Sequence, residues 1–376
     1  MVICFDATPE AKKALDTLLS TRQFRDVSEL ISMALMNYDV LQRSITSTTA
    51  QAPSSIQPLP CPKPADSAPQ GSAAASARVS PFGQLSKKVP DIFTIQNRAT
   101  EGIRTMPRPE QTAPPTRNLP PRGWLFGQLN RFLPAKVTCR ALLNISRQNP
   151  AGISVNEAAS MISFAACDLG DYLRELDTIR SLKREDSYAA AFPSTAYHGA
   201  ESRVRFGSQF VGNVKQGQLT GLPAGLNLVA HDGSKEPKLF LTAAGVEFAL
   251  LENPVLDLGD GIQFRKLSEA EIEFLLQHIT KFVDPEISAY IAIIDGIKAG
   301  ATTPEKLDEF LCSRFNLSVV EKADQANQIT RTFLTTQRTG AISRMADLDL
   351  VGRDKKGIRV TYFVTHPGEC FRSRVG

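Results

Sequence analysis

The sequence predicts a mainly α-helical protein with small β-hairpins, which belongs to the α+β class. Apolar residues recur at helical spacing through most of residues 123–376, and Ser-x-x-Glu patterns typical of helix starts occur at Ser154, Ser268 and Ser318. Alternation of apolar and polar residues is confined to short runs such as Ile358–Val364, so the predicted strands are few and short. The 376 residues are enough for two or three domains.

Composition narrows the classes of protein. No run approaches the ~18 apolar residues of a membrane span, and the N-terminus lacks the apolar core of a signal peptide. We therefore expect no membrane partner and a cytoplasmic location. The six cysteines include no CxxC pair, which argues against a zinc site or a disulfide framework. The net charge of +4 is too small to identify a partner, so the placement of charge matters more.

Residues 1–45 are predicted to form a small unit. Met1–Ala7 fits a strand, Thr8-Pro9-Glu10 is a typical helix start, and a second helix begins near Ser28. So short a unit buries too little surface to fold alone. The order resembles the ribbon-helix-helix family of repressors and antitoxins, and this resemblance implies a homodimer formed through residues 1–45.

The same resemblance raises the question of DNA recognition by the N-terminal strand. In that family two strands pair across the dimer and enter the major groove. Neither face of Met1–Ala7 offers the Arg, Lys or Asn that recognises base edges. Dimerisation alone and groove recognition are the two alternatives for this unit.

Residues 46–122 are predicted to be a disordered linker. The stretch is rich in Pro, Ser and Ala, contains 14 of the 24 prolines, and shows no lasting apolar period. Such a composition cannot bury enough surface to offset the entropy lost on ordering. Within it, Phe82–Leu85 and Asp91–Ile95 are candidate short docking segments for a partner.

Residues 123–262 are predicted to form one domain. A helix follows Pro134, a second begins at Ser154, and a third carries Leu169, Leu173, Leu176 and Ile179. Strand-like runs follow at Ser187–Phe192, Ser202–Phe206, Leu226–Val229 and Lys238–Thr242. The order resembles a winged helix-turn-helix domain with a long wing. The third helix shows Asp168, Asp171 and Glu175 on its outer face, which suits a partner protein better than DNA.

Residues 263–376 are predicted to form a second domain of the same kind. Helices are expected after Ser268, Asp284, Thr303 and Ser318, and a short last helix buries Ile342, Met345 and Leu348. A hairpin with Gly357 at its tip follows. Helix and basic hairpin resemble the recognition helix and wing of winged-helix proteins. Asp349 stands where such proteins often have Gly, and Asp tolerates the left-handed conformation.

Both predicted hairpins end in the same pattern. Leu241-Thr-Ala-Ala-Gly245 and Val364-Thr-His-Pro-Gly368 share a Leu/Val-Thr-x-x-Gly sequence. The pattern resembles the end of the last wing strand in many winged-helix regulators. Two copies, each after helices and strands, indicate a tandem pair of winged-helix domains.

The C-terminal domain supplies the candidate DNA contacts. Basic side chains gather at the hairpin, so we expect phosphate contacts from the wing and base contacts from the last helix, above all from Ser343 and Arg344. The residues predicted to contact double-stranded DNA are Thr336, Thr339, Ser343, Arg344, Arg353, Lys355, Lys356 and Arg359.

The sequence shows no pattern typical of an enzyme. The four histidines are far apart, and HExxH, P-loop, GxSxG and GxGxxG motifs are absent. We therefore expect no catalytic residue, cofactor or metal. The leading hypothesis is a dimeric prokaryotic DNA-binding regulator or autorepressor. The alternatives are a non-enzymatic adaptor of a toxin–antitoxin, plasmid-maintenance or phage-defence complex, and a plasmid replication initiator.

Overall fold

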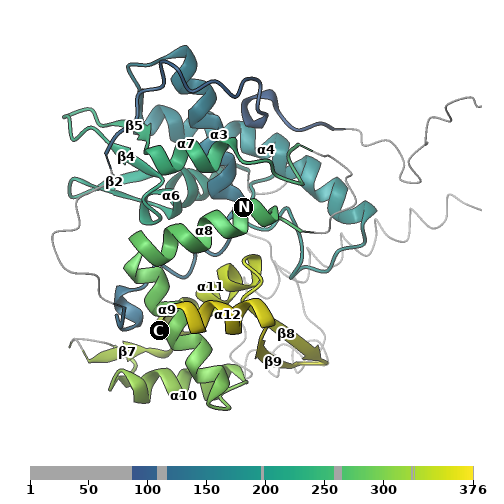
Figure 1. Ribbon diagram of the computed structural model, residues 1–376, viewed down its shortest axis with the longest axis vertical. Coiled ribbons are helices and arrows are strands. Elements are labelled where there is room, and N and C mark those ends of the chain that lie inside the picture. Colours follow the sequence, from purple (N-terminus) through teal and green to yellow (C-terminus); the bar gives the residue numbers. More distant parts are fainter. Residues whose placement is uncertain are drawn as a thin grey trace, which may run out of the picture. The chain divides into compact units, whose positions relative to one another are not determined.

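The computed structural model describes residues 87–107, 117–195, 199–257, 265–322, 325 and 327–375. The predicted ribbon-helix-helix unit at residues 1–45 and most of the predicted linker lie outside the described residues. The prediction of a mainly helical protein with small β-sheets is confirmed for the described part (Figure 1). No helix in those residues is both long enough and apolar enough to cross a membrane.

The described residues of the first half, from Leu133 on, form five α-helices, a π-helical turn and two small sheets. Its elements are α3 (Leu133–Gln148), β1 (Ile153–Ser154), α4 (Val155–Ile179), α5 (Gly199–Phe206), the π-helical turn η3 (Gly207–Val211), β2 (Asn213–Lys215), β3 (Gln218–Thr220), α6 (Leu222–Gly225), β4 (Val229–His231), β5 (Lys238–Leu241) and α7 (Ala243–Leu250). The main sheet is antiparallel with the order β1-β5-β4, and it pairs Ile153 with Leu239 and Val229 with Leu241. The sheet thereby joins strands that are far apart in the sequence.

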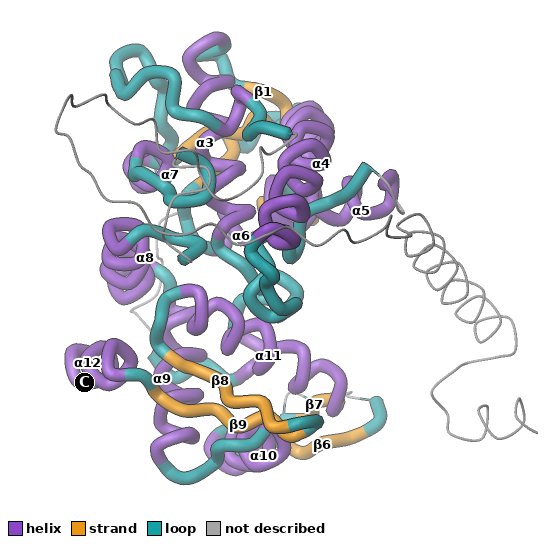
Figure 2. The backbone as a smooth tube through the Cα atoms, turned by 90° about the vertical axis from the view of Figure 1, so that its right-hand side faces the viewer, coloured by secondary structure: helices purple, strands orange, loops and turns teal. Residues whose placement is uncertain are grey.

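The second half is organised around longer helices. Its elements are α8 (Glu269–Phe282), α9 (Asp284–Lys298), α10 (Pro304–Arg314), β6 (Ser318–Val320), β7 (Gln328–Thr330), α11 (Arg331–Asp347), β8 (Val351–Lys356), β9 (Arg359–Val364) and α12 (His366–Val375). β6 and β7 pair in parallel, and β8 and β9 form an antiparallel hairpin. Gly357 has φ +61° at the hairpin tip, as the sequence predicted. Figure 2 shows this hairpin alongside α11, which β8 contacts.

Helix starts follow the capping residues in two of three predicted places. Ser154 accepts a hydrogen bond from the Glu157 N–H, and Ser268 forms a complete capping box with Glu271. The prediction at Ser318 is wrong. Residues 318–320 form strand β6, which pairs with β7 and so satisfies the same backbone groups that a helix would.

Two other predictions for the first half are corrected. The second and third predicted helices are one helix, α4, because its buried face continues without a break through Ile162, Ala166, Leu169 and Leu173. The runs Ser187–Phe192 and Ser202–Phe206 are not strands. The first is formed by turns and the second belongs to α5, where Phe206 is buried and Val204 faces solvent. A short run of alternating apolar and polar residues fits a strand or a helix, because one turn of a helix can also place two apolar residues on different sides.

Part of the predicted linker is folded. In the 3₁₀ turn η1 (Asp91–Phe93), the Phe93 side chain is fully buried, and the Asn144 amide donates to the carbonyls of Ile92 and Thr94. The candidate docking segment 91–95 therefore packs on α3 of its own chain. A second turn, η2 (Pro121–Gly123), leads into Trp124, which is buried and donates from Nε1 to the Leu119 carbonyl at 2.8 Å. The predicted end of the linker at residue 122 is too late, because Phe93 and Pro121, which precede it, are already buried in the folded part.

A buried ion pair joins the first half to α8. Lys136 on α3 lies 2.8 Å from Glu271 on α8, and neither side chain is exposed. The same ammonium donates to the carbonyls of Phe248 and Leu251 at the end of α7. Burial lowers the pKa of Lys136 to about 8. The ammonium group of Lys136 thus contacts the end of α7 and the carboxylate of Glu271, so it fixes α7 and α8 against α3.

The two hairpins end in the same three-dimensional arrangement, which we call the hairpin junction. It consists of Asn227-Leu228 with Thr242 to Gly245 in the first half, and Asp349-Leu350 with Thr365 to Gly368 in the second. Asn227 and Asp349 are both left-handed, with φ +56° and +59°. Thr242 and Thr365 each donate to that residue's carbonyl and accept from the glycine N–H at 3.1 Å. The shared sequence pattern thus corresponds to one repeated structure.

We expect Gly245→Ala and Gly368→Ala to destabilise the protein. A methyl group at either position would lie 2.0 Å from a backbone carbonyl oxygen, that of Leu228 or Leu350. The backbone has to move to relieve this overlap, so the free energy of unfolding should fall by about 1–3 kcal/mol for each change. Chemical denaturation measures it. Gly123→Ala is the control, because a methyl group there meets only the Leu119 side chain. Equal effects at all three positions would contradict the crowding at Gly245 and Gly368.

Candidate nucleic-acid interface

Helix α11 begins earlier than the sequence predicted. Thr330 caps it by accepting a hydrogen bond from the Phe333 N–H, and the helix continues for 17 residues to Asp347. Only part of its first half faces solvent: Arg331, Thr332 and Thr339 are exposed, and Thr336 is half-buried. Sequence reasoning missed Arg331 and Thr332 because the helix was expected to start at Thr335 or Thr339. The capping threonine after the Gln328–Ile329 strand was the available signal.

The second half of α11 is buried, which corrects the prediction for Ser343 and Arg344. Arg344 is fully buried and donates to both carboxylate oxygens of Glu286 on α9, at 2.5 and 2.9 Å, and to the Leu129 carbonyl. Ser343 is 5% exposed. Neither residue is placed to contact a base.

The chain's own segment 119–132 covers that part of α11. The Gln337 amide donates to the Pro121 carbonyl at 2.9 Å. Gly127 and Gly340 bring the two backbones so close that a methyl group on Gly340 would lie 2.0 Å from the Gly127 oxygen. The sequence predicts that the face of α11 opposite its apolar residues is exposed. Nothing in α11 itself indicates that a distant segment packs there.

The β8–β9 hairpin is present and carries exposed basic side chains. Lys355, Lys356 and Arg359 are exposed, and Arg353 is half-buried nearer the base. Ile358 beside the tip is 98% exposed. Lys355 lies 3.0 Å from Glu185 in the loop after α4, and Lys356 lies 3.6 Å from Asp354. The hydrogen bond from Lys355 lowers the pKa of Glu185. Exposed ion pairs of this kind are weak and screened by salt, so the lysines can exchange partners.

The base of the hairpin is held firmly. The Tyr362 N–H donates to the Thr302 carbonyl at 2.7 Å, which adds a backbone contact from the α9–α10 connection to β9. Arg338 on α11 donates to Asp308 on α10 at 2.6 Å and to the Tyr362 hydroxyl at 3.2 Å. Helices α10 and α11 and the hairpin are therefore fixed to one another, while the tip extends into solvent.

The acidic face predicted on α4 is only partly available. Asp168 is exposed, but Asp171 is half-buried and accepts hydrogen bonds from Lys87, Arg174, Ser194 and Thr195. Burial alone would raise the pKa of Asp171, yet the bonds from Thr195 and Lys87 lower it below its ordinary value. Glu175 also interacts within the chain. Asp171 and Glu175, which the sequence suggested for contact with a partner protein, thus already interact within the chain.

Cys139 and Cys167 are buried, whereas the Cys370 thiol lies 3.7 Å from His366 Nε2 at the surface of α12. In the described residues no three His, Cys, Asp or Glu side chains are grouped to hold a metal. Burial raises the pKa of the Cys139 thiol to about 12. Comparisons with protein-family models, with curated proteins and with solved structures found no match to this chain.

We expect Arg344→Met to destabilise the protein strongly. It leaves the Glu286 carboxylate buried without its cation, which typically costs roughly 3–5 kcal/mol. The double variant R344M/E286Q should recover part of this loss, because the buried charge is removed. Urea denaturation measures both. Thr339→Ala, on the exposed part of the same helix, should change the free energy of unfolding by less than about 0.5 kcal/mol. A mild effect of R344M would contradict the buried ion pair.

Proposed function

We propose that this protein is a DNA-binding regulator whose C-terminal half, residues 284–364, is a winged-helix unit that binds double-stranded DNA. The single observation that carries the proposal is the β8–β9 hairpin, which is anchored at its base and basic at its exposed end. The three helices α9, α10 and α11 followed by the β8–β9 hairpin, with Thr302 bonded to β9, are in the order expected of such a unit, and the parallel strands β6 and β7 lie between α10 and α11.

The hairpin suits contacts with phosphates. Between Arg353 and Arg359 there are four basic side chains and one acidic side chain, Asp354. Lys and Arg that neutralise phosphates release counterions from DNA, which supplies most sequence-independent affinity. The contacts of Lys355 with Glu185 and of Lys356 with Asp354 are exposed, so phosphate can replace the carboxylates.

The exposed half of α11 suits contacts with bases. The major groove admits an α-helix, and threonine side chains contact base edges and the thymine methyl group. Thr332, Thr336 and Thr339 share one side of the helix; Thr332 and Thr339 are exposed, and Thr336 is half-buried where its backbone packs against Gly127 of segment 119–132. We therefore assign base contacts to these threonines and to Arg331, in place of Ser343 and Arg344.

The first half supports the proposal through its likeness to the second. Its sheet order β1-β5-β4 and its hairpin junction match a winged-helix unit. However, α6, which precedes that junction, has four residues where α11 has 17. A helix of one turn cannot span a groove, so the first half acts as a scaffold. Residues 1–45 would dimerise the chain and bring two C-terminal units to paired sites.

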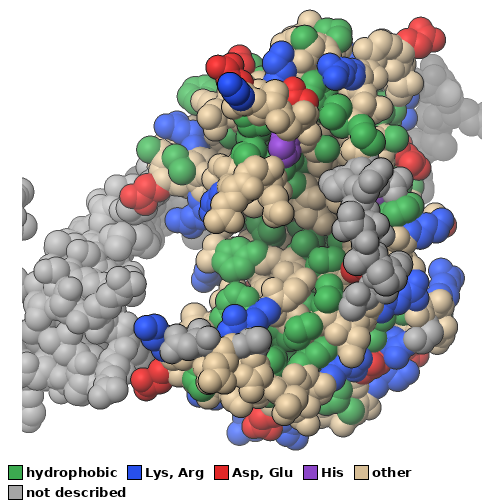
Figure 3. All heavy atoms as spheres, turned by 90° about the vertical axis from the view of Figure 1, so that its left-hand side faces the viewer, with side chains coloured by type: hydrophobic (Ala, Val, Ile, Leu, Met, Phe, Trp, Pro, Cys, Tyr) green, Lys and Arg blue, Asp and Glu red, His purple; other side chains and the backbone are tan. Residues whose placement is uncertain are grey.

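One observation favours a protein-binding adaptor as a second candidate. Phe164 on α4 and Val204 on α5 are 65% and 73% exposed and line the same surface pocket. Hydrophobic side chains also gather in the middle of the face shown in Figure 3, while Lys and Arg lie mostly toward its edges. Exposed apolar patches often mark protein contacts. An adaptor that binds only protein would show no salt-dependent affinity for duplex DNA.

We expect the triple variant K355Q/K356Q/R359Q to bind duplex DNA with a weaker salt dependence. Each lost phosphate contact should reduce the slope of log K against log salt by about 0.9. Fluorescence anisotropy of a labelled duplex at several salt concentrations measures the slope. The control K281Q/K298Q/R374Q removes three exposed charges outside the proposed interface. If both variants keep the wild-type slope, the hairpin does not contact DNA.

A further inference from the structure

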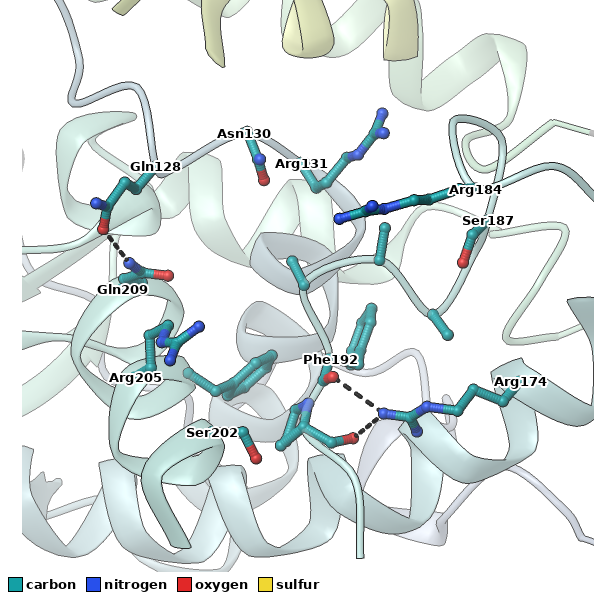
Figure 4. Close-up of a pocket in the computed structure, with 15 residues that line it drawn as sticks. Gln128, Asn130, Arg131, Arg174, Arg184, Ser187, Phe192, Ser202, Arg205 and Gln209 are labelled. Atoms are coloured by element: carbon teal, nitrogen blue, oxygen red, sulfur yellow. Dashed lines mark hydrogen bonds between the residues drawn. The ribbon is translucent and has the colours of Figure 1, made fainter. Parts of the chain in front are cut away.

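The structure contains a pocket that is rich in arginine and lies outside the proposed DNA contacts. It has a volume of about 750 Å³ and is formed by residues 128–131, the end of α4, the loop 184–193 and α5 (Figure 4). Four arginines line it, Arg131, Arg174, Arg184 and Arg205, and no Asp or Glu does. Small-molecule sites usually occupy roughly 300–1,000 Å³, so the pocket is large enough for a ligand of nucleotide size.

Two of the arginines are already neutralised and held. Arg174 is 3.1 Å from Asp171 and donates to the carbonyls of Phe192 and Pro193. Arg131 is 3.0 Å from Asp347 and donates to the Glu185 carbonyl. Their contacts fix the wall of the pocket.

The other two arginines are uncompensated. Arg184 and Arg205 are exposed, and their guanidinium groups form no hydrogen bond or ion pair with the described part of the chain. Figure 4 shows their side chains extending toward each other from opposite sides of the pocket. Gln209 donates to Gln128 at 2.9 Å beside Arg205 and adds polar groups to that wall. Two guanidinium groups thus face one cavity without a counter-charge.

We propose that this pocket binds a ligand bearing two or more phosphate groups through Arg184 and Arg205. A guanidinium group binds phosphate through two parallel hydrogen bonds, so two such groups can each bind one phosphate of a di- or triphosphate or of adjacent backbone phosphates. Two sources share this chemistry: a free phosphorylated small molecule and the backbone of a bound nucleic acid.

The pocket is connected to the candidate interface by its fixed residues. Arg131 joins it to Asp347 at the end of α11, and the loop that carries Arg184 also carries Glu185, the partner of Lys355 on the hairpin. A ligand that orders this loop would therefore act on the hairpin. This coupling rests on the proposed function, whereas phosphate binding by the pocket does not.

The test uses the full chain and inorganic tripolyphosphate as the probe, with binding measured by isothermal titration calorimetry. The variant R184Q/R205Q should bind the probe at least roughly tenfold more weakly than wild type, because two charge-assisted contacts are lost. The control K298Q/R374Q removes the same charge from exposed positions on α9 and α12 and should bind as wild type does. Equal affinities in both variants, or no binding to wild type, would overturn the proposal.

A second arm distinguishes the two sources of phosphate. If the pocket binds nucleic-acid backbone, R184Q/R205Q should also lower the salt slope of duplex binding, by about 0.9 for each contact, and tripolyphosphate should displace the duplex. If it binds a free ligand, the slope should stay at the wild-type value while tripolyphosphate binding is lost. Because K355Q/K356Q/R359Q tests the hairpin separately, loss of one activity with retention of the other identifies which proposal fails.

Discussion

The buried pair between Arg344 and Glu286 organises the C-terminal half. Removing two charges from water is costly, and the cost is offset only where the geometry is good and the remaining hydrogen-bonding groups are satisfied. Here the guanidinium bonds both carboxylate oxygens and the Leu129 carbonyl. The pair therefore fixes α9, α11 and segment 119–132 to one another. This arrangement positions α11 with its exposed threonines, and Arg338 on the same helix holds the base of the hairpin through Tyr362.

Buried ion pairs also connect the first half of the described chain to the second. Lys136 with Glu271 fixes α3 to α8, and Arg131 with Asp347 fixes the start of α3 to the end of α11. Polar groups buried in this way specify geometry more than they add stability, since an ion pair tolerates fewer arrangements than an apolar contact. The consequence is that basic residues in this protein have two roles. Some are structural cations in the interior, and others remain at the surface.

That division explains how much could be predicted from the sequence. Local features were predictable: Ser268 and Glu271 as a capping box, Gly357 at the hairpin tip, the left-handed Asp349, and the repeated Thr-x-x-Gly pattern. Each depends on residues close in the chain. The burial of Arg344 was not predictable, because its partners Glu286 and Leu129 are distant in sequence and helical spacing alone marks its position as outward. The arginine-lined pocket was not predictable for the same reason, because the residues that line it come from four separate segments of the chain.

The short helix α6 makes the two halves of the chain unequal in the surface that they can present to a partner. The hairpin junction is kept in both halves, yet only the second retains a helix long enough to lie along a groove. Under the function that we propose, each polypeptide would therefore contact DNA through its second half alone. The homodimer that we propose through residues 1–45 would then place two such contacts on a pair of inverted sequences.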